Sequence, residues 1–184
     1  YNFRQNDLEN GGQGAPLTPI FHNALANKIN KKFNLKFPIN ILNIGGIANI
    51  TTTTDWKDLW HKNKIYAYDI GPGNCLIDKW IRKNSDKFYD EDGNLAKEGK
   101  IDKFIYDQYL ENYHYSKINS KRSLDTNDFD ISFAKGLSLE NGTATITAIT
   151  AEIISKKIGD NDLYICGGGR KNKTVVNLLK SKIK

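Results

Sequence analysis

The chain has no methionine, and cysteine, histidine and proline are scarce, numbering two, three and four among 184 residues. Two cysteines cannot form a disulfide framework, and Cys75 and Cys166 lie too far apart in sequence to resemble paired metal ligands. We expect both to be reduced thiols packed in the interior, as in proteins of reducing compartments. The expected location is therefore the cytoplasm.

Long apolar runs and targeting signals are also missing. No apolar stretch approaches the ~20 residues needed to span a bilayer, so no membrane role is indicated. The chain begins Tyr1-Asn2-Phe3-Arg4, without an initiating methionine or a charged region followed by an apolar one. Together with the absence of methionine, this start predicts an internal piece of a larger protein, truncated at both ends.

Concentrated positive charge is absent as well, although the net charge is +6. The lysines are spread along the chain beside 21 acidic residues, with no basic stripe interleaved with aromatics, which argues against nucleic-acid binding. A positive field would still attract an anionic nucleotide. The length suits one domain, or a single lobe of a two-lobed enzyme over residues 1–184.

Hydrophobic periodicity predicts alternating helices and strands. Apolar residues recur every four positions from Phe21 to Phe33, which indicates an amphipathic helix. Strands are expected at 39–44 and 47–53, as an antiparallel hairpin around Gly45-Gly46, and at 64–70 and 163–166. Helices are expected at 75–81, 101–110, 143–158 and from 174 onward. This order predicts an α/β fold with a mixed sheet flanked by helices.

Three strand ends carry glycines, at Gly45-Gly46, Gly71-Pro72-Gly73 and Gly167-Gly168-Gly169. Ligands gather at strand ends in α/β sheets, and glycine lets backbone N–H groups approach a phosphate without obstruction. Hairpin glycines with positive φ, and close helix–strand packing, are the structural alternatives. The predicted nucleotide-binding residues are Asn43, Gly45, Gly46, Gly71, Gly73, Asn74, Gly167, Gly168, Gly169 and Asn172.

Asp69 ends a strand directly before the second glycine turn. A carboxylate held there could take a proton from a hydroxyl or water, an effect of about 10²–10⁴-fold in rate. The ordinary alternative is a turn or helix-capping aspartate. Asn74 is expected to cap the next helix, with the amides of Gly73 and Asn74 facing a cleft. We interpret the whole pattern as nucleotide-dependent phosphoryl transfer to a sugar.

The remaining polar motifs favour structural roles. His22, His61 and His114 have no metal ligands at suitable spacing, so we expect structural or surface residues. The run Asp90-Glu91-Asp92-Gly93 hints at a calcium loop but lacks the distal glutamate, which leaves a solvated turn as the interpretation. No metal site is predicted.

These motifs, in this order, carry a resemblance to a known family. The matching segments are Phe3-Arg4 with Asp7, residues 11–17, 42–50, Asp69 with 71–74, and 166–169, with weaker matches at 89–93, 123–125 and 142–145. The chain resembles the second half of anhydro-N-acetylmuramic acid kinases, in the actin and sugar-kinase superfamily. The resemblance implies a ribonuclease H-like, actin-like kinase lobe and a possible homodimer.

The resemblance also implies an activity and roles for residues. The enzyme would use ATP and Mg²⁺ to open the 1,6-anhydro ring of its sugar with water and phosphorylate O6, yielding N-acetylmuramic acid 6-phosphate in cell-wall recycling. Asp69 matches the catalytic base, Gly45 and Gly46 a phosphate-binding hairpin, and 167–169 the adenosine loop. The implied sugar-binding residues are Arg4, Asp7 and Gln13.

The sequence departs from the family pattern in places. Asn2 stands where an aspartate is usual, Thr126 stands where an arginine is common, and the first phosphate-binding loop and the final segment are missing. Because phosphoryl transfer depends on positioning by all these parts, we expect the chain to be inactive alone. The alternatives are a related levoglucosan-type kinase and a non-catalytic nucleotide- or sugar-binding module.

Overall fold

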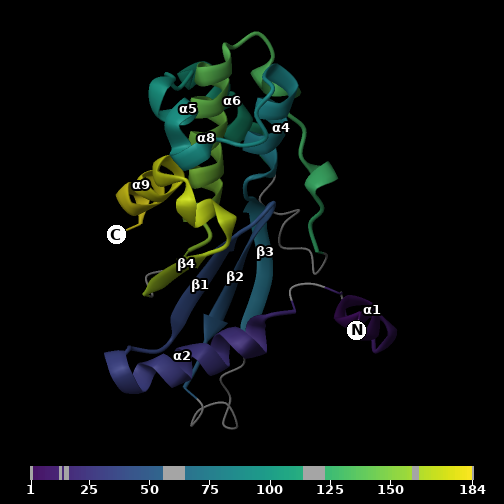
Figure 1. Ribbon diagram of the computed structural model, residues 1–184, viewed down its shortest axis with the longest axis vertical. Coiled ribbons are helices and arrows are strands. Elements are labelled where there is room, and N and C mark those ends of the chain that lie inside the picture. The colour runs from purple at the N-terminus through teal and green to yellow at the C-terminus, as the bar shows by residue number, and fades with distance from the viewer. Residues whose placement is uncertain are drawn as a thin grey trace.

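A four-stranded mixed sheet lies at the centre of the molecule (Figure 1). The computed structural model describes residues 2–12, 14, 17–55, 65–113, 123–158 and 162–183. The strands are β1 (Ile39–Ile44), β2 (Ile47–Thr53), β3 (Tyr66–Pro72) and β4 (Leu163–Cys166), in the order β3-β2-β1-β4. The pairs β1–β2 and β2–β3 are antiparallel, while β1–β4 is parallel. The predicted hairpin and mixed sheet are confirmed.

Helices gather at one end of this sheet, with α8 (Leu139–Ser155) at their centre (Figure 1). Packed against α8 are α4 (Cys75–Asn84), α5 (Asn94–Glu98), α6 (Lys103–Asn112) and α9 (Lys173–Lys182). Short 3₁₀ turns join them: η1 (Glu91–Gly93), η2 (Thr126–Asp128), η3 (Ser132–Ala134) and η4 (Gly168–Lys171). This arrangement confirms the predicted α/β fold and is consistent with an actin-like sugar-kinase lobe.

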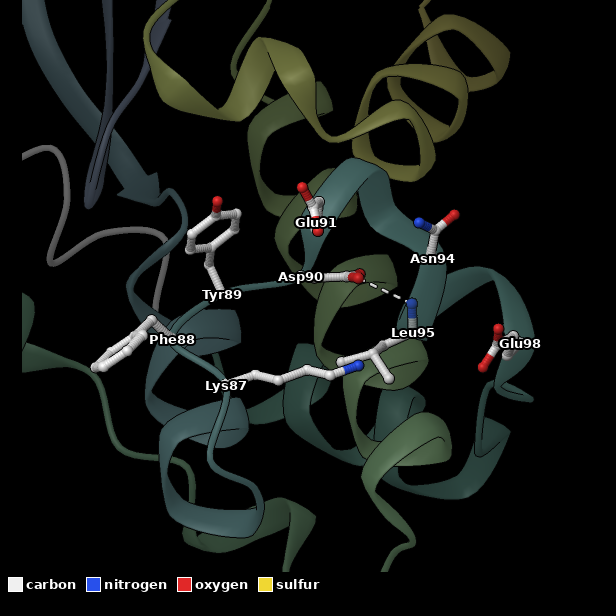
Figure 2. Close-up of a pocket in the computed structure, with 8 residues that line it drawn as sticks. All are labelled: Lys87, Phe88, Tyr89, Asp90, Glu91, Asn94, Leu95 and Glu98. Atoms are coloured by element: carbon white, nitrogen blue, oxygen red, sulfur yellow. Dashed lines mark hydrogen bonds between the residues drawn. The ribbon is translucent and has the colours of Figure 1, made fainter.

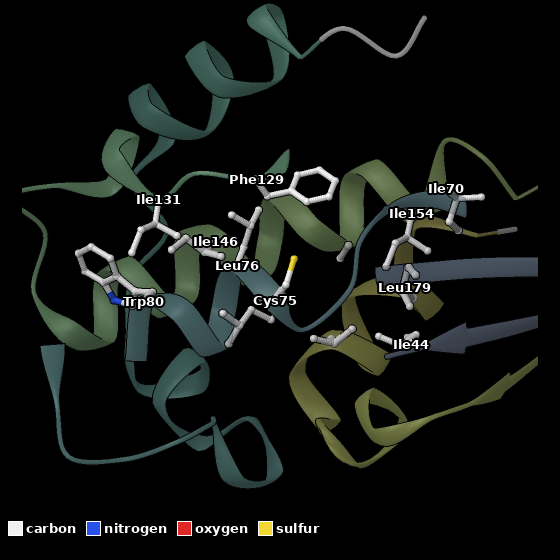
Figure 3. Close-up of a cluster of buried hydrophobic side chains, with 14 of the residues drawn as sticks. Ile44, Ile70, Cys75, Leu76, Trp80, Phe129, Ile131, Ile146, Ile154 and Leu179 are labelled. Atoms are coloured by element: carbon white, nitrogen blue, oxygen red, sulfur yellow. The ribbon is translucent and has the colours of Figure 1, made fainter. Parts of the chain in front are cut away.

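The hydrophobic core lies between the sheet and these helices (Figure 3). Alternate residues Leu42, Ile44 and Ile50 point from the sheet into it and are fully buried. Each such side chain stabilises the fold by about 1.5–3 kcal/mol. At the far end, the Trp80 indole N–H donates to the Leu139 carbonyl at 3.0 Å. The core therefore ties β1, β2, α4 and α8 into one unit.

Helix α2 (Pro19–Phe33) crosses the opposite side of the sheet (Figure 1). The prediction of a helix is confirmed, but its apolar stripe does not face the sheet. Phe21 and Phe33 have exposed fractions of 64% and 60%, and Leu25 is exposed too. Periodicity identified the helix correctly and assigned the wrong face to the interior.

Polar side chains attach α2 to the sheet instead. Asn23 Oδ1 accepts the Thr54 N–H at 2.7 Å, and Asn27 Nδ2 donates to the Thr54 carbonyl at 2.8 Å. His22 Nδ1 lies 2.9 Å from Thr51 Oγ1, and burial lowers the pKa of His22. The reason for the reversed face is that the backbone beyond β2 needs hydrogen-bond partners, which asparagine supplies and phenylalanine cannot.

Helix α1 (Phe3–Glu9) stands apart from the sheet, on its β3 side (Figure 1). Both cysteines are free thiols as predicted; Cys75 is buried in the core and Cys166 is half-buried. Within the described part of the chain, no helix combines the length and the apolar character needed to cross a membrane.

Candidate functional site

Three polar side chains form a row across the sheet, on the face opposite α8. Asn43 pairs with Asn49 in the β1–β2 register, and Asn49 pairs with Asp69 in the β2–β3 register. Directly paired residues on neighbouring strands share a face and lie about 4.5–5.5 Å apart at Cβ. All three are half-buried. Asn49 was missed by the sequence analysis, although the symmetry of the hairpin about Gly45-Gly46 places it opposite Asn43.

A β-bulge lies beside Asp69. Asn49 pairs with Asp69 whereas Ala48 pairs with Gly71, so Ile70 is an extra residue on β3. Bulges re-aim side chains and are frequent near active sites. Ile70 uses the local bend to enter the core, where it is fully buried, while Asp69 stays on the opposite face.

The Asp69 carboxylate is held by a distant segment. The Leu124 N–H donates to Asp69 Oδ2 at 2.9 Å, across 55 residues of sequence. Burial raises the pKa of Asp69, and the Leu124 amide opposes that shift by stabilising the charged form. The capping alternative is wrong, because the N-cap position of α4 belongs to Asn74 and Asp69 accepts from a loop.

Four of the predicted nucleotide-binding glycines are required by packing. A Cβ on Gly73 would lie 2.3 Å from the Gly45 carbonyl oxygen, and one on Gly71 would lie 2.7 Å from Ile153 Cγ2. A Cβ on Gly169 would lie 2.3 Å from Ile44 Cγ2, and Gly167 has φ +81° and no room beside Asn43. For these positions the close-packing explanation is sufficient.

At the other three positions, Gly45, Gly46 and Gly168, close packing does not require a glycine. None has a positive φ, so the expected reason for a glycine hairpin turn does not apply. Added Cβ atoms would have their nearest neighbours at 3.4, 3.3 and 3.9 Å, respectively. The closest of these is the methyl of Thr126, beside Gly46. Glycine at these three positions leaves space on the surface that a side chain would fill.

The glycine hairpin is bonded to the start of α4. The N–H groups of Gly73 and Cys75 donate to the Gly46 carbonyl at 2.9 and 3.0 Å, and the Asn74 N–H donates to the Gly45 carbonyl at 2.7 Å. The prediction that the Gly73 and Asn74 amides face a cleft is therefore wrong. Asn74 does occupy the N-cap position of α4, but its side chain makes no capping hydrogen bond.

A cleft of about 510 Å³ opens between α4, η1 and η4. The Asn74 side chain lies against Gly168 and Gly169, so the second and third glycine turns meet at this cleft. The size is within the range of small-molecule sites. Its lining includes Asn74, Asp78, Tyr89, Glu91, Asp92, Gly168, Gly169 and Asn172.

An adjoining hollow of about 320 Å³ shares Tyr89, Asp90 and Glu91 with the cleft (Figure 2). The Asp90 carboxylate accepts the N–H groups of Leu95 at 2.8 Å and Ala96 at 3.1 Å. Asp90 is buried, so the expectation of a solvated turn is wrong for this residue. Its carboxylate organises the first turn of α5.

Asn172, predicted to bind the nucleotide, also stabilises the fold. Its Oδ1 accepts the Val175 N–H at 3.0 Å and so caps α9, and the side chain is buried. Arg170 donates to the Gly167 carbonyl at 2.7 Å. Both residues therefore shape the third glycine turn.

Two of the predicted sugar-binding residues, Arg4 and Asp7, lie on α1 and bond with the loop that follows it. The Arg4 Nε donates to the Gly14 carbonyl at 3.2 Å, and the Gly14 N–H donates to Asp7 Oδ2 at 2.8 Å. These bonds tie α1 to its own following loop, away from the sheet (Figure 1). Gln13 lies outside the described residues, as do His61 and His114.

No group of three or more His, Cys, Asp or Glu side chains that could hold a metal ion occurs among the described residues. The site therefore consists of a half-buried carboxylate, two asparagines, an open glycine hairpin and a neighbouring cleft. Such a set can accept a proton and admit a small-molecule ligand.

Comparison with known proteins shows which family the sequence matches. The family model for anhydro-N-acetylmuramic acid kinase matches residues 1–184. A protein named anhydro-N-acetylmuramic acid kinase from Pelagibacter ubique is 42% identical to this chain, over all of this chain and 49% of the relative. Another of that name, from Zymomonas mobilis, is 36% identical, over all of this chain and 48% of the relative. One from Brucella canis is 37% identical, over 97% of this chain and 47% of the relative. The chain thus spans about half the length of these relatives.

Proposed function

Because the chain belongs to the anhydro-N-acetylmuramic acid kinase family, we propose that it forms part of an ATP-dependent kinase acting on 1,6-anhydro-N-acetylmuramic acid. The proposed reaction adds water across the anhydro bridge and phosphorylates O6, giving N-acetylmuramic acid 6-phosphate and ADP in cell-wall recycling. It is proposed for the whole protein, of which this chain supplies one portion.

The observation that carries the proposal is the position of Asp69. Its carboxylate lies in a polar row beside a bulge in β3, with one oxygen held by Leu124 and the other free of hydrogen bonds from the described residues. Asp69 would take a proton from the water that attacks the anomeric carbon. The bond between that carbon and O6 would break, and O6 would accept the γ-phosphoryl group.

The partial burial of Asp69 suits this role. Burial raises the pKa of the carboxyl group and so makes the carboxylate a stronger base than an exposed aspartate. The Leu124 N–H keeps the ionised form favourable and fixes the orientation of Oδ2. Asp69 must be ionised to act, so we expect activity to fall as the pH drops through its pKa.

The open glycines would admit the nucleotide. Gly45 and Gly46 would allow its phosphates to approach the hairpin backbone, and Gly168 would provide a side-chain-free wall for the adenosine. ATP supplies the phosphoryl group. The remaining predicted contacts would come from Asn43 beside the hairpin and from Asn74 and Asn172 in the cleft.

Magnesium has no matching group of ligands in the described residues, so we assign no residue to it. Mg²⁺ commonly enters kinase sites on the phosphates of the substrate, with few protein ligands. A cytoplasmic location, based on the expected reduced cysteines, and a homodimer, based on the family resemblance, are further parts of the proposal.

The test uses the full-length protein that carries this chain, with ATP, Mg²⁺ and either 1,6-anhydro-N-acetylmuramic acid or levoglucosan. ADP release and the sugar phosphate are both quantified. Asp69→Asn should lower kcat by about 10²–10⁴-fold, while Asp86→Asn, an exposed surface control, should not.

Three other results would each revise the proposal. Preference for levoglucosan would assign the protein to a neighbouring activity. ATP binding without turnover would indicate a binding module. Full activity of Asp69→Asn would remove Asp69 from the role of base.

A further inference from the structure

The ammonium group of Lys79 forms hydrogen bonds with two backbone carbonyls. Its Nζ donates to the Thr126 carbonyl and, at 3.0 Å, to the Phe129 carbonyl, 47 and 50 residues further along the chain. Lys79 lies on α4, whose first residues are bonded to the Gly45-Gly46 hairpin. Hydrogen bonds from an ammonium group are stronger than neutral ones, so Lys79 fastens residues 123–129, here called the 123–129 loop, to α4.

The 123–129 loop is also ordered from within. Asp125 accepts the Asn127 N–H at 2.8 Å, and Asp128 Oδ2 accepts the Asp125 N–H at 2.7 Å, which closes a capping box around η2. Phe129 is buried in the core at the end of the loop. The loop is therefore a preformed turn that is placed by core packing of Leu124 and Phe129 and by a few hydrogen bonds from outside the loop.

This loop touches both halves of the candidate site. Leu124 donates its N–H to Asp69 Oδ2, and the Thr126 methyl lies beside Gly46, 3.3 Å from where a Cβ would be. Lys79 binds the carbonyl of Thr126 itself and that of Phe129, three residues further along the loop. A shift of the loop would therefore alter the orientation of the carboxylate and the space over the hairpin together.

We propose that Lys79 is a positioning residue that holds the 123–129 loop in place and thereby aims the Asp69 carboxylate. It acts through Leu124 and does not itself contact the reacting atoms. The catalytic part of this inference rests on the proposed function, whereas the placement of the loop does not. Two separate measurements therefore distinguish a failure of one from a failure of the other.

The experiment uses the full-length protein with Lys79→Met, Lys79→Gln and Lys79→Arg. Lys83→Met is the matched control, since Lys83 lies on the same helix and is exposed. Hydrogen exchange of residues 123–129, followed by mass spectrometry, reports the loop without any need for activity. Steady-state kinetics report kcat and KM, and thermal unfolding verifies that each variant is folded.

We expect Lys79→Met and Lys79→Gln to raise exchange in the loop and to lower kcat about tenfold or more, with KM changed less than threefold. Lys79→Arg should restore much of both, because guanidinium can also donate to two carbonyls. Asp69→Asn should leave the loop bound, since its amide oxygen can still accept the Leu124 N–H.

Unchanged exchange in Lys79→Met and Lys79→Gln would overturn the proposal, whatever the kinetics. If exchange rises but kcat is unchanged, Lys79 holds the loop but does not aim the Asp69 carboxylate, and the positioning role is overturned. If the unmodified protein has no kinase activity, the proposed function fails, and exchange in the loop still decides whether Lys79 holds it. If Lys79→Met does not fold, Lys79→Gln, which keeps a neutral donor, carries the same test.

Discussion

Gly73 and Gly46 are joined by one hydrogen bond, yet only Gly73 has no room for a side chain. A Cβ on Gly73 would lie 2.3 Å from a backbone oxygen, whereas a Cβ on Gly46 would meet a movable methyl at 3.3 Å. The same contrast separates Gly169, packed on Ile44, from Gly168 next to it. A glycine motif can therefore combine residues that build the turn with residues that leave it open.

The comparison separates two kinds of evidence for function. Close packing in the fold is enough to account for the packed glycines, so they are not evidence for a ligand. Open glycines, at Gly45, Gly46 and Gly168, have no such explanation in the described structure, so they carry the argument for a ligand. Substitutions that affect either stability or binding can sharpen or break this distinction.

The largest expected effect comes from Asp69→Asn. This substitution tests the role of Asp69 as a base and adds no atoms beside the packed or the open glycines. Its kcat should fall about 10²–10⁴-fold in the full-length protein. The folded-state pKa of Asp69 is raised, so its ionised form costs stability above that pKa and the neutral amide avoids the cost. The free energy of unfolding at pH 7, measured in urea, should stay the same or rise. A marked loss of stability would mean that Asp69 is a structural residue.

Gly73→Ala should be strongly destabilising. The new Cβ cannot be accommodated beside the Gly45 carbonyl unless the hairpin separates from α4, which we expect to cost about 3 kcal/mol. Urea unfolding followed by circular dichroism measures the change. An alanine tolerated at Gly73 without loss would abolish the distinction between packed and open glycines.

Gly46→Ala should show the opposite pattern. The free energy of unfolding should change by about 1 kcal/mol or less, because only the Thr126 methyl must move. Nucleotide affinity, measured by calorimetry on the full-length protein, should fall about tenfold, since the Cβ blocks approach to the hairpin backbone. Equal affinities for the variant and the unmodified protein would contradict a phosphate-binding role for Gly46.

The smallest effect concerns His22, remote from both sets of glycines. Its folded-state pKa is lowered, so the unfolded chain binds the proton more readily. The stability that neutral His22 contributes is complete above the unfolded pKa of about 6.5 and is lost as the pH falls below it. His22→Gln should flatten this part of the stability curve and leave nucleotide affinity unchanged. The slope is obtained from urea unfolding at a series of pH values.

Local patterns predicted most of the elements. The hairpin from 39 to 53 and strand β4 follow from branched residues and turn glycines, and α8 follows from helical spacing. Helix α2 was predicted with the wrong face inward, because its partners are backbone groups beyond β2 that no periodicity identifies. The polar segment around α5 was not placed, since the buried Asp90 that organises it is indistinguishable from a surface turn in the sequence.

The candidate site was predicted in part. Asp69 and the open glycines were predicted as site residues from expected strand ends, where a ligand is expected. The expected strand end at Asp69 is wrong, because β3 continues to Pro72. Asn49 required the hairpin register, and Lys79 required the contact between α4 and the 123–129 loop. The ligand-binding roles of Arg4, Asp7 and Gln13 remain predictions.

By itself, the sequence determined the types of elements, their order and the family, because periodicity, turn residues and motif spacing are properties of short segments. Tertiary structure alone decided which glycines are packed, which face of α2 is inward and what holds Asp69. Each of those answers depends on atoms from distant segments, as with Leu124 and Asp69, which are 55 residues apart in the chain. Only folding brings such atoms within hydrogen-bond distance, and their directions then follow from the packing of the surrounding core.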